Sequence, residues 1–267
     1  MNDFRSRLGA PMRTVEKALK LLDFFTDKVT EIGLSDLARL SGIDKATVLR
    51  MLQDMAESGF VEQNPENKRW RLGAGILRLA RLREAAQPVT RVLTPILERL
   101  AGETGETAHA SLLSGRDLAN IGVIEPARAN RVYIEPGLAL PLHATASGLA
   151  FTAFARPEQR DRVLGRKLSA ITGTTPVTRD SLAAMLARTA ERGFAVADQT
   201  YEAEVYGLAV PLFGPDGFAC GALAVATPAS RVSEPHERGI LAALAPAAAE
   251  ATRGLGGRVP AHHRITY

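Results

Sequence analysis

The hydrophobic positions of the first sixty residues follow helical spacing in three successive segments. Apolar residues three and four apart predict an amphipathic helix over 15–25, a short helix over 36–40 and a longer helix over 45–57. Asp44 stands where the N-cap of the third helix is expected, and Gly42 gives the turn before it the necessary backbone freedom. The positions expected to face inward on the first two helices are Val15, Ala18, Leu19, Leu22, Phe25, Leu37, Ala38 and Leu40.

Two short extended segments follow these helices. Residues 60–62 and 70–72 have the composition of strands, and the turn-rich segment 64–67 connects them into a hairpin. Three helices followed by a hairpin predict a winged helix-turn-helix. Residues 73–86 then return to a helical pattern that ends before Pro88, and we expect this helix to link two domains.

Beyond Pro88, helical and extended patterns alternate along the chain. The helical patterns cover 89–103, 145–155, 157–165, 178–192 and 234–253. The extended patterns cover 107–114, 117–124, 130–134, 194–198, 206–213 and 218–227. The fold class is therefore α+β, with an N-terminal winged helix-turn-helix, a linker helix and a C-terminal domain built around a mostly antiparallel sheet.

These patterns divide the chain into four parts. We expect a winged helix-turn-helix domain at 12–74, a linker helix at 75–88, a second domain at 89–254, and a tail at 255–267 that is disordered.

Charge is distributed unevenly along the 267 residues, whose formal net charge is +4. Residues 1–88 contain 15 Lys and Arg against 12 Asp and Glu, whereas residues 89–267 contain 18 against 17. Between Lys68 and Arg83 there are six basic residues and no acidic one, a run that suits either a solvated helix face or a nucleic-acid contact. The single cysteine, Cys220, and the lack of any apolar run of about 20 residues fit a cytoplasmic protein that does not cross a membrane.

The third helix has two distinct faces, as a recognition helix requires. Val48, Met51, Leu52 and Met55 follow core spacing, while Lys45, Ala46, Leu49, Arg50 and Gln53 point the other way, with Thr47 near the helix start. In the major groove, Arg50 suits guanine, Gln53 suits adenine, and Leu49 or Ala46 suits the thymine methyl group. Backbone N–H groups after Ser35, the expected N-cap of the second helix, suit a phosphate. Lys68, Arg69 and Arg71 on the hairpin suit the DNA backbone or the minor groove. The predicted partner is double-stranded DNA.

Several motifs resemble those of the IclR family of regulators. In the first domain they are residues 47–52 (TVLRML), 59–62 (GFVE) and 70–73 (WRLG), and in the second domain 140–148 (LPLHATASG), 193–198 (GFAVAD) and 228–232 (PASRV). The resemblance covers residues 12–254. It implies that residues 12–74 are the DNA-binding domain and that residues 89–254 form a GAF-like effector-binding and oligomerisation domain. It also implies binding to DNA as a homodimer or dimer of dimers, and control of a catabolic operon.

A catalytic role for the second domain is disfavoured. The candidate side chains are His109, His143, His236, Asp198, Cys220, Glu202 and Glu204. They lack the spacing of metal ligands, and the chain has neither a Gly-x-Ser-x-Gly elbow nor a phosphate-binding glycine loop. We interpret His143 as a histidine bonded to backbone and Cys220 as a small core residue. The sequence predicts no enzyme activity, no metal and no cofactor.

The last predicted strand bears on the effector. Alternation places Phe218, Cys220, Ala222, Ala224 and Ala226 on one face and Ala219, Gly221, Leu223 and Val225 on the other. The resemblance implies serines at the positions of Ala224 and Ala226, and a cysteine at that of Gly207, in members that bind small polar keto acids. The small residues here indicate either close helix packing or a roomy, apolar pocket wall.

The polar contacts of such a pocket are expected at its ends. Backbone N–H groups of Thr145, Ala146, Ser147 and Gly148 suit a carboxylate, and Asp198 needs a donor. The hypothesis is a hydroxylated aromatic or similarly bulky organic acid. The alternative is an oligomeric DNA-binding protein without an effector.

The linker helix predicts self-association. It carries Ile76, Leu77, Leu79, Ala80 and Leu82, more apolar residues than one exposed helix needs. Since one winged domain reads only a few base pairs, we expect a twofold-symmetric assembly on a pseudo-palindromic operator.

Overall fold

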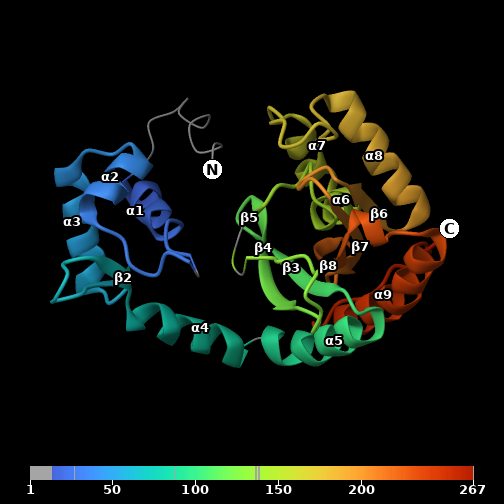
Figure 1. Cartoon of the computed structure of the whole chain (residues 1–267), viewed down its shortest axis with the longest axis horizontal. Helices are drawn as coiled ribbons and strands as arrows, with labels where there is room; N and C mark the ends of the chain where they lie inside the picture. The colour runs from blue at the N-terminus through green and yellow to red at the C-terminus, as the bar shows by residue number, and fades with distance from the viewer. Residues whose placement is uncertain (1–13, 27, 87, 136, 138, 267) are drawn as a thin grey trace. The chain divides into compact units, whose positions relative to one another are not determined.

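The computed structural model describes residues 14–266, apart from positions 27, 87, 136 and 138. The chain forms two compact units that meet between residues 87 and 88. Helices and strands of both units are labelled in Figure 1.

The first unit is a small helical domain with a two-stranded hairpin. Its elements are α1 (Thr14–Leu22), α2 (Leu34–Ser41), α3 (Lys45–Glu57), β1 (Val61–Gln63), β2 (Trp70–Leu72) and α4 (Ala74–Ala86). The strands are antiparallel, and Ile32 adds a bridge to Trp70. The core consists of Leu21, Ile32, Leu37, Val48, Met51, Leu52, Val61 and Trp70. The predicted winged helix-turn-helix is confirmed.

Two details of the first helices differ from the prediction. Leu21, rather than Val15 or Leu19, is fully buried, and the latter two are 70% and 55% exposed. Leu40 is also exposed, at 39%. Helix α2 begins at Leu34 with Gly33 as its N-cap, so Ser35 lies inside the first turn and caps nothing. Spacing revealed the helices, but neighbouring elements decide which face is buried.

The second unit is built on a six-stranded antiparallel sheet with the order β5-β4-β3-β8-β7-β6. The strands are β3 (Thr107–Ser114), β4 (Asp117–Ile124), β5 (Ala139–Leu140), β6 (Ala195–Asp198), β7 (Val205–Phe213) and β8 (Ala219–Pro228). The helices are α5 (Val89–Thr104), α6 (Ala146–Phe154), α7 (Pro157–Leu164), α8 (Arg179–Arg192), η1 (Ala229–Arg231) and α9 (Glu234–Gly254).

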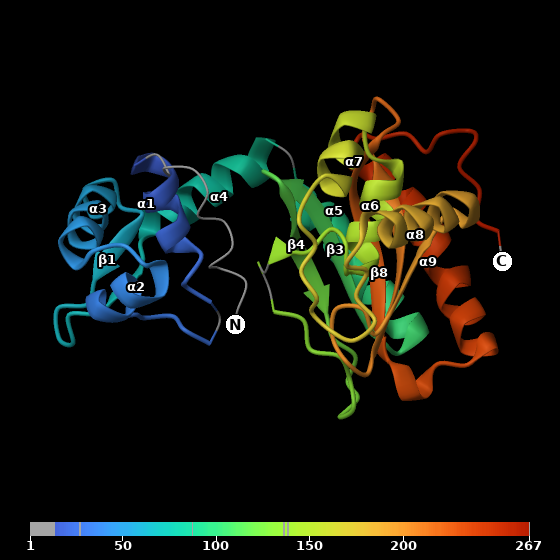
Figure 2. The same cartoon turned by 90° about the horizontal axis from the view of Figure 1, so that it is seen from above.

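Helices cover both faces of this sheet (Figures 1 and 2). One hydrophobic core lies between the sheet and helices α5 and α9. The other lies on the opposite face, where α6 packs on the sheet and α7 and α8 pack around α6. The expected α+β class is confirmed.

One predicted strand is absent. Residues 130–134 form no strand, and the short edge strand β5 lies further along the chain. Val132 is nevertheless buried, and its carbonyl accepts a hydrogen bond from the Thr107 hydroxyl at 2.6 Å. The apolar pattern there anchors a loop instead of pairing a strand.

A β-bulge changes the faces of β8. Its register with β7 shifts between Leu212 and Phe213, so that Phe213 pairs with Ala219 and Cys220 is the extra residue. As a result Ala219 packs beneath α6 together with Ala222 and Ala224, whereas Cys220 packs on the opposite core. The predicted alternation is wrong before the bulge and correct after it.

The tail, predicted to be disordered, is ordered where the structure describes it. The His263 ring lies between Phe154 and Phe213, with centroid distances of 5.0 Å to each. Its Nε2 is 2.9 Å from the Gly193 carbonyl, and Thr266 donates to the Arg192 carbonyl. Within the described residues, no helix combines the length and the apolar character that crossing a membrane requires.

Candidate functional site

Helix α3 presents the expected DNA-reading face. Asp44 caps it by accepting a hydrogen bond from Thr47 N at 2.9 Å, and this bond holds the pKa of Asp44 below its ordinary value. Val48, Met51 and Leu52 are buried and fix the helix on the core. The residues of the outer face that are exposed are Lys45, Ala46, Arg50 and Gln53. A rigid helix with short, basic and amide side chains outward has the geometry that major-groove reading requires.

Two residues assigned to that face are less accessible than expected. Thr47 is half-buried, and Leu49 packs partly against the core of the first unit. Leu49 is thus placed at the edge of the exposed face, where its contact with a base is limited.

Glu31 organises the wing. Its carboxylate accepts hydrogen bonds from the side-chain amides of Asn64 at 2.9 Å and Asn67 at 2.8 Å, and these bonds lower its pKa. The Glu31 carbonyl accepts from the Arg69 guanidinium at 3.0 Å. The turn between β1 and β2 is therefore tied to the segment before α2. Sequence reasoning missed Glu31, because its partners lie more than thirty positions away.

The three basic wing residues are not equivalent. Arg71 pairs with Glu62 at 2.6 Å and Glu31 at 3.5 Å, and the Glu62 bond raises its pKa. Lys68 lies exposed at the tip in a left-handed conformation, with φ of 58°, and no described residue pairs with its ammonium. Lys68 is thus the wing residue most available to a phosphate.

Helix α6 begins in a closely packed corner. The Thr145 hydroxyl accepts from Gly148 N and donates to the Pro141 carbonyl, both at 3.0 Å. A Cβ on Gly148 would meet Leu142 Cα at 2.6 Å, so only glycine permits this approach. Thr145, Ala146, Ser147 and Gly148 are all buried, and among the described residues nothing accepts from the backbone N–H groups of Ala146 and Ser147.

Three of the remaining predicted effector residues lie around this corner. Ala224 and Ala226 are buried on β8, and Gly207 on β7 pairs with Ala226. A Cβ on Gly207 would lie 3.1 Å from Ala146 Cβ, so the helix packs directly on the sheet there.

Asp198 does not lie at this corner. It is exposed at the end of β6 opposite Tyr206, on the sheet face that carries Val196 and Tyr206 and that α9 covers, and Gln199 Nε2 donates to it at 3.2 Å. Strand alternation places it on the face opposite Ala197 and α6, so the prediction of Asp198 as an effector residue is not supported by its position.

Two loops converge on the start of α6, one between α7 and α8 and the other between β6 and β7. The Thr200 hydroxyl donates to the Ala144 carbonyl, and the Thr175 hydroxyl to the Thr200 carbonyl, both at 2.6 Å. His143 Nε2 lies 3.0 Å from the Ser169 carbonyl, which confirms the prediction of a backbone-bonded histidine. Gln199 and Glu204 both have positive φ, 57° and 66°, a strain that concentrates at functional sites.

His109 lies beneath the first turn of α6. Its Nε2 is 3.3 Å from the Ser147 hydroxyl, and burial lowers its pKa to about 4, so the ring is neutral near pH 7. Sequence reasoning considered His109 only as a catalytic candidate. Only the alignment of β3 with α6 reveals its position.

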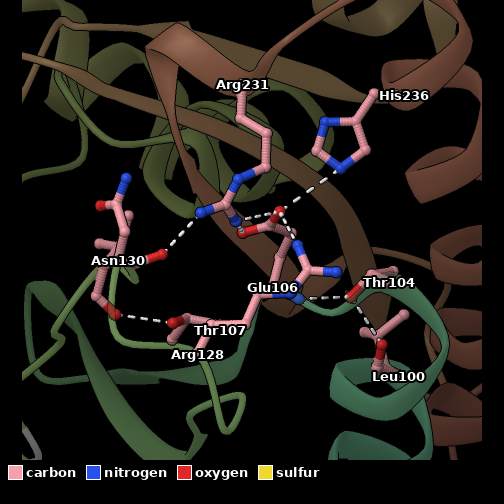
Figure 3. Close-up of polar contacts among 9 residues, drawn as sticks. Leu100, Thr104, Glu106, Thr107, Arg128, Asn130, Arg231 and His236 are labelled. Carbon is pink, nitrogen blue, oxygen red and sulfur yellow. Dashed lines mark hydrogen bonds and ion pairs between the residues drawn. The ribbon is translucent and has the colours of Figure 1, made fainter.

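A second polar cluster joins the start of β3 to the start of α9 (Figure 3). The fully buried Glu106 carboxylate contacts Arg231, with Arg128 at 3.6 Å and His236 Nε2 at 3.4 Å. Arg231 also donates to the Asn130 carbonyl at 2.6 Å. The cluster neutralises a buried charge and holds the loop after β4.

The candidate catalytic side chains do not converge on one centre. His109, His143 and His236 contact Ser147, Ser169 and Glu106, respectively. In the part of the chain that the structure describes, no three His, Cys, Asp or Glu side chains are grouped as metal ligands.

Comparison with known proteins agrees with both units. Residues 14–65 match the family model described as IclR helix-turn-helix domain. Residues 85–253 match the model described as bacterial transcriptional regulator IclR C-terminal.

Individual relatives are similar along nearly the whole chain. The HTH-type transcriptional regulator XynR of Escherichia coli is 30% identical over 92% of this chain and 98% of that protein. The crystal structure of a putative IclR regulator from Silicibacter is 42% identical, with a TM-score of 0.85, over 95% of this chain and 100% of that one. An IclR homologue from Microbacterium hydrocarbonoxydans, complexed with 4-hydroxybenzoate, is 25% identical, with a TM-score of 0.76, over 91% and 99% of the two chains.

Proposed function

The chain belongs to the IclR family of bacterial transcriptional regulators, and on that basis we propose that it controls a catabolic operon in response to a small organic acid. It is a DNA-binding regulator and not an enzyme. Because its target is chromosomal DNA, its place of action is the cytoplasm.

The outer face of α3 reads base edges in the major groove. Arg50 pairs with guanine and Gln53 with adenine, while Lys45, Ala46, Thr47 and Leu49 complete the contact surface. Lys68 and Arg69 follow the DNA backbone, with Arg71 beside them, and the backbone near Ser35 contacts a phosphate. The observation that carries this assignment is the combination of a buried face and an exposed basic face on one capped helix.

The DNA-binding form is a homodimer or a dimer of dimers. None of the described side chains of α4 is buried, and its exposed apolar residues include Leu77, Leu79 and Leu82. These leucines pack against a second copy, and a twofold assembly requires a pseudo-palindromic operator.

The effector is a hydroxylated aromatic or similarly bulky organic acid. Its carboxylate binds the N–H groups of Ala146 and Ser147 in the segment Thr145 to Gly148 at the start of α6, because those of Thr145 and Gly148 already donate within the chain. Its apolar body lies against Gly207, Ala224 and Ala226. The 4-hydroxybenzoate in the Microbacterium homologue supports an acid of this class.

A thermal-shift panel tests the effector class. Ligand at a hundredfold its dissociation constant stabilises a protein by about 2.7 kcal/mol, which raises the Tm measurably. We expect 4-hydroxybenzoate and related acids to raise the Tm and to change operator affinity. A shift with pyruvate and glyoxylate, combined with none from aromatic acids, would contradict the proposed effector class.

The close contact between Ala146 and Gly207 favours a second candidate, an oligomeric DNA-binding protein without an effector. In that case no metabolite would change the Tm or operator affinity of the full chain. Binding of any organic acid with an effect on operator affinity excludes this candidate.

A further inference from the structure

A set of polar side chains lies under α6, on the same face of the sheet as the alanines of β8. His109 on β3 stands opposite Ala224, and Ser111 stands opposite Ala222. Asn120 on β4 stands opposite Ser111, whose hydroxyl donates to the Asn120 Oδ1 at 2.8 Å. The Ser147 contact of His109 shows that this face looks toward the start of α6.

Two atoms of this set lack hydrogen-bond partners among the described residues: His109 Nδ1 and Asn120 Nδ2. Both side chains are buried, His109 being 8% exposed and Asn120 5%. A buried polar group without a partner costs about 1–3 kcal/mol, so native proteins rarely leave two of them on adjacent strands. Among the described residues of this unit, the other buried side-chain atoms without a partner lie on α6, β8 and α9: the hydroxyls of Thr152 and Thr227 and the Nδ1 of His236.

The arrangement differs from that of His236, the other histidine of the described part of this unit whose Nδ1 is buried without a partner. His236 Nε2 faces the charged Glu106 carboxylate, whereas His109 Nε2 contacts the neutral Ser147 hydroxyl. The adjacent strand β4 carries a second unpartnered nitrogen, that of Asn120. The neighbour of His109 on β8 is Ala224, which provides no polar atom. A polar ligand atom could therefore serve as the partner of His109 Nδ1.

The charge state determines which ligand group fits. Since burial holds the pKa of His109 at about 4, the ring offers a neutral hydrogen bond and no positive charge. The Asn120 amide is neutral as well. A carboxylate is therefore better placed at the free N–H groups of Ala146 and Ser147, and a hydroxyl or carbonyl group at His109.

We infer that His109 and Asn120 form a neutral hydrogen-bonding subsite of the effector site, which selects acids carrying an additional hydroxyl or carbonyl group. The subsite rests on the proposed effector function. It adds two specificity-determining residues, on β3 and β4, to a site otherwise placed on α6, β7 and β8.

The test compares acids that differ only in this group. The pairs are 4-hydroxybenzoate with benzoate and pyruvate with propionate, titrated calorimetrically into the full chain. The variants are His109→Phe and Asn120→Leu, and Thr152→Val is the matched control, because it removes a buried unpartnered hydroxyl of α6 outside the subsite. We expect the wild type and Thr152→Val to prefer the oxygenated acid of the binding pair by about tenfold. His109→Phe should abolish that preference. Its affinity for the acid without the hydroxyl or carbonyl group should stay within about twofold of the wild-type value.

The outcomes separate the two proposals. If the wild type binds none of the four acids, the effector proposal and the subsite are both overturned. If the wild type binds but His109→Phe keeps the preference for the oxygenated acid, only the subsite is overturned. Should His109→Phe not fold, ¹⁵N NMR of the wild-type histidines provides the test. We expect the chemical shift of His109 Nδ1 to change when the oxygenated acid binds, and not when the acid without the hydroxyl or carbonyl group binds. A chemical shift that neither acid changes would overturn the subsite.

Discussion

One guanidinium nitrogen of Arg231 lies 2.5 and 2.6 Å from the two carboxylate oxygens of Glu106. Glu106 is fully buried at the start of β3, whereas Arg231 precedes α9 and is partly exposed. The pair connects segments 125 positions apart, so its strength bears on the stability of the whole second unit.

Removing Arg231 should destabilise the protein more than removing both members of the pair. Arg231→Met leaves a buried carboxylate with only the more distant Arg128 and His236, and we expect the free energy of unfolding to fall by about 3 kcal/mol. Chemical denaturation of the single variant, of Glu106→Leu and of the double variant measures the coupling. If Arg231→Met and the double variant lose the same free energy of unfolding, the charge pair is not the source of the stability.

Stability should fall as the pH is lowered from about 6.5 toward 4. The unfolded chain protonates His109 near its ordinary pKa of 6.5, while the folded chain resists protonation until about 4. Because the unfolded state binds more protons in this window, the free energy of unfolding decreases with falling pH, by about 3 kcal/mol in total. The lowered pKa of His263 acts in the same direction. The measurement is chemical denaturation of the wild type and of His109→Gln between pH 6.5 and 5. The free energy of unfolding should change less steeply with pH in His109→Gln than in the wild type. Identical slopes would mean that His109 is accessible to protons in the folded state.

Arg50 and Lys68 should affect operator binding differently. Arg50→Ala removes the proposed base contact, so we expect the operator-binding free energy to weaken by about 1–3 kcal/mol and the preference at one base pair per half-site to relax. Lys68→Ala removes the proposed phosphate contact, so affinity for all sequences should fall and the slope of log affinity against log salt concentration should decrease by about one unit. Binding measurements over a salt series and a randomised operator distinguish the two. An unchanged sequence preference in Arg50→Ala would identify another face of α3 as the reading face.

The exposed leucines of α4 should control assembly. Leu77 and Leu82 are 57% and 58% exposed, and Leu77→Ser with Leu82→Ser should shift the protein toward the monomer. Arg78→Ser, on the same helix, is the control and should leave assembly intact. Sedimentation velocity at micromolar concentration measures both. A wild type that already sediments as a monomer would remove the basis for a pseudo-palindromic operator.

Local signals explain which elements could be predicted from the sequence. The bounds of α3 followed from Asp44 as its cap and from the spacing of Val48, Met51 and Leu52. Strands β3 and β4 were also located, because alternation and turn residues act within a few positions.

The errors share a different cause, since each depends on contacts with distant segments. Leu21 is buried because α2 and α3 lie against that side of α1. The bulge at Cys220 depends on the register with β7, so it cannot be predicted from the alternation of residues within β8. In the candidate site, His109 and Glu31 have partners 38 and 33 or more positions away. Both residues are polar by type, but their hydrogen-bond partners can be identified only from the folded structure.

The docked tail also constrains how the chain can evolve. Gly193 ends α8 with φ of 78°, a conformation that asparagine also tolerates. A Cβ there, however, would lie 2.0 Å from the carbonyl oxygen of Arg264 in the returning tail. Relatives that share this tail are therefore expected to keep glycine at the position, whereas relatives whose chain does not return there are free to exchange it for asparagine. Position 193 and the tail should thus be inherited together.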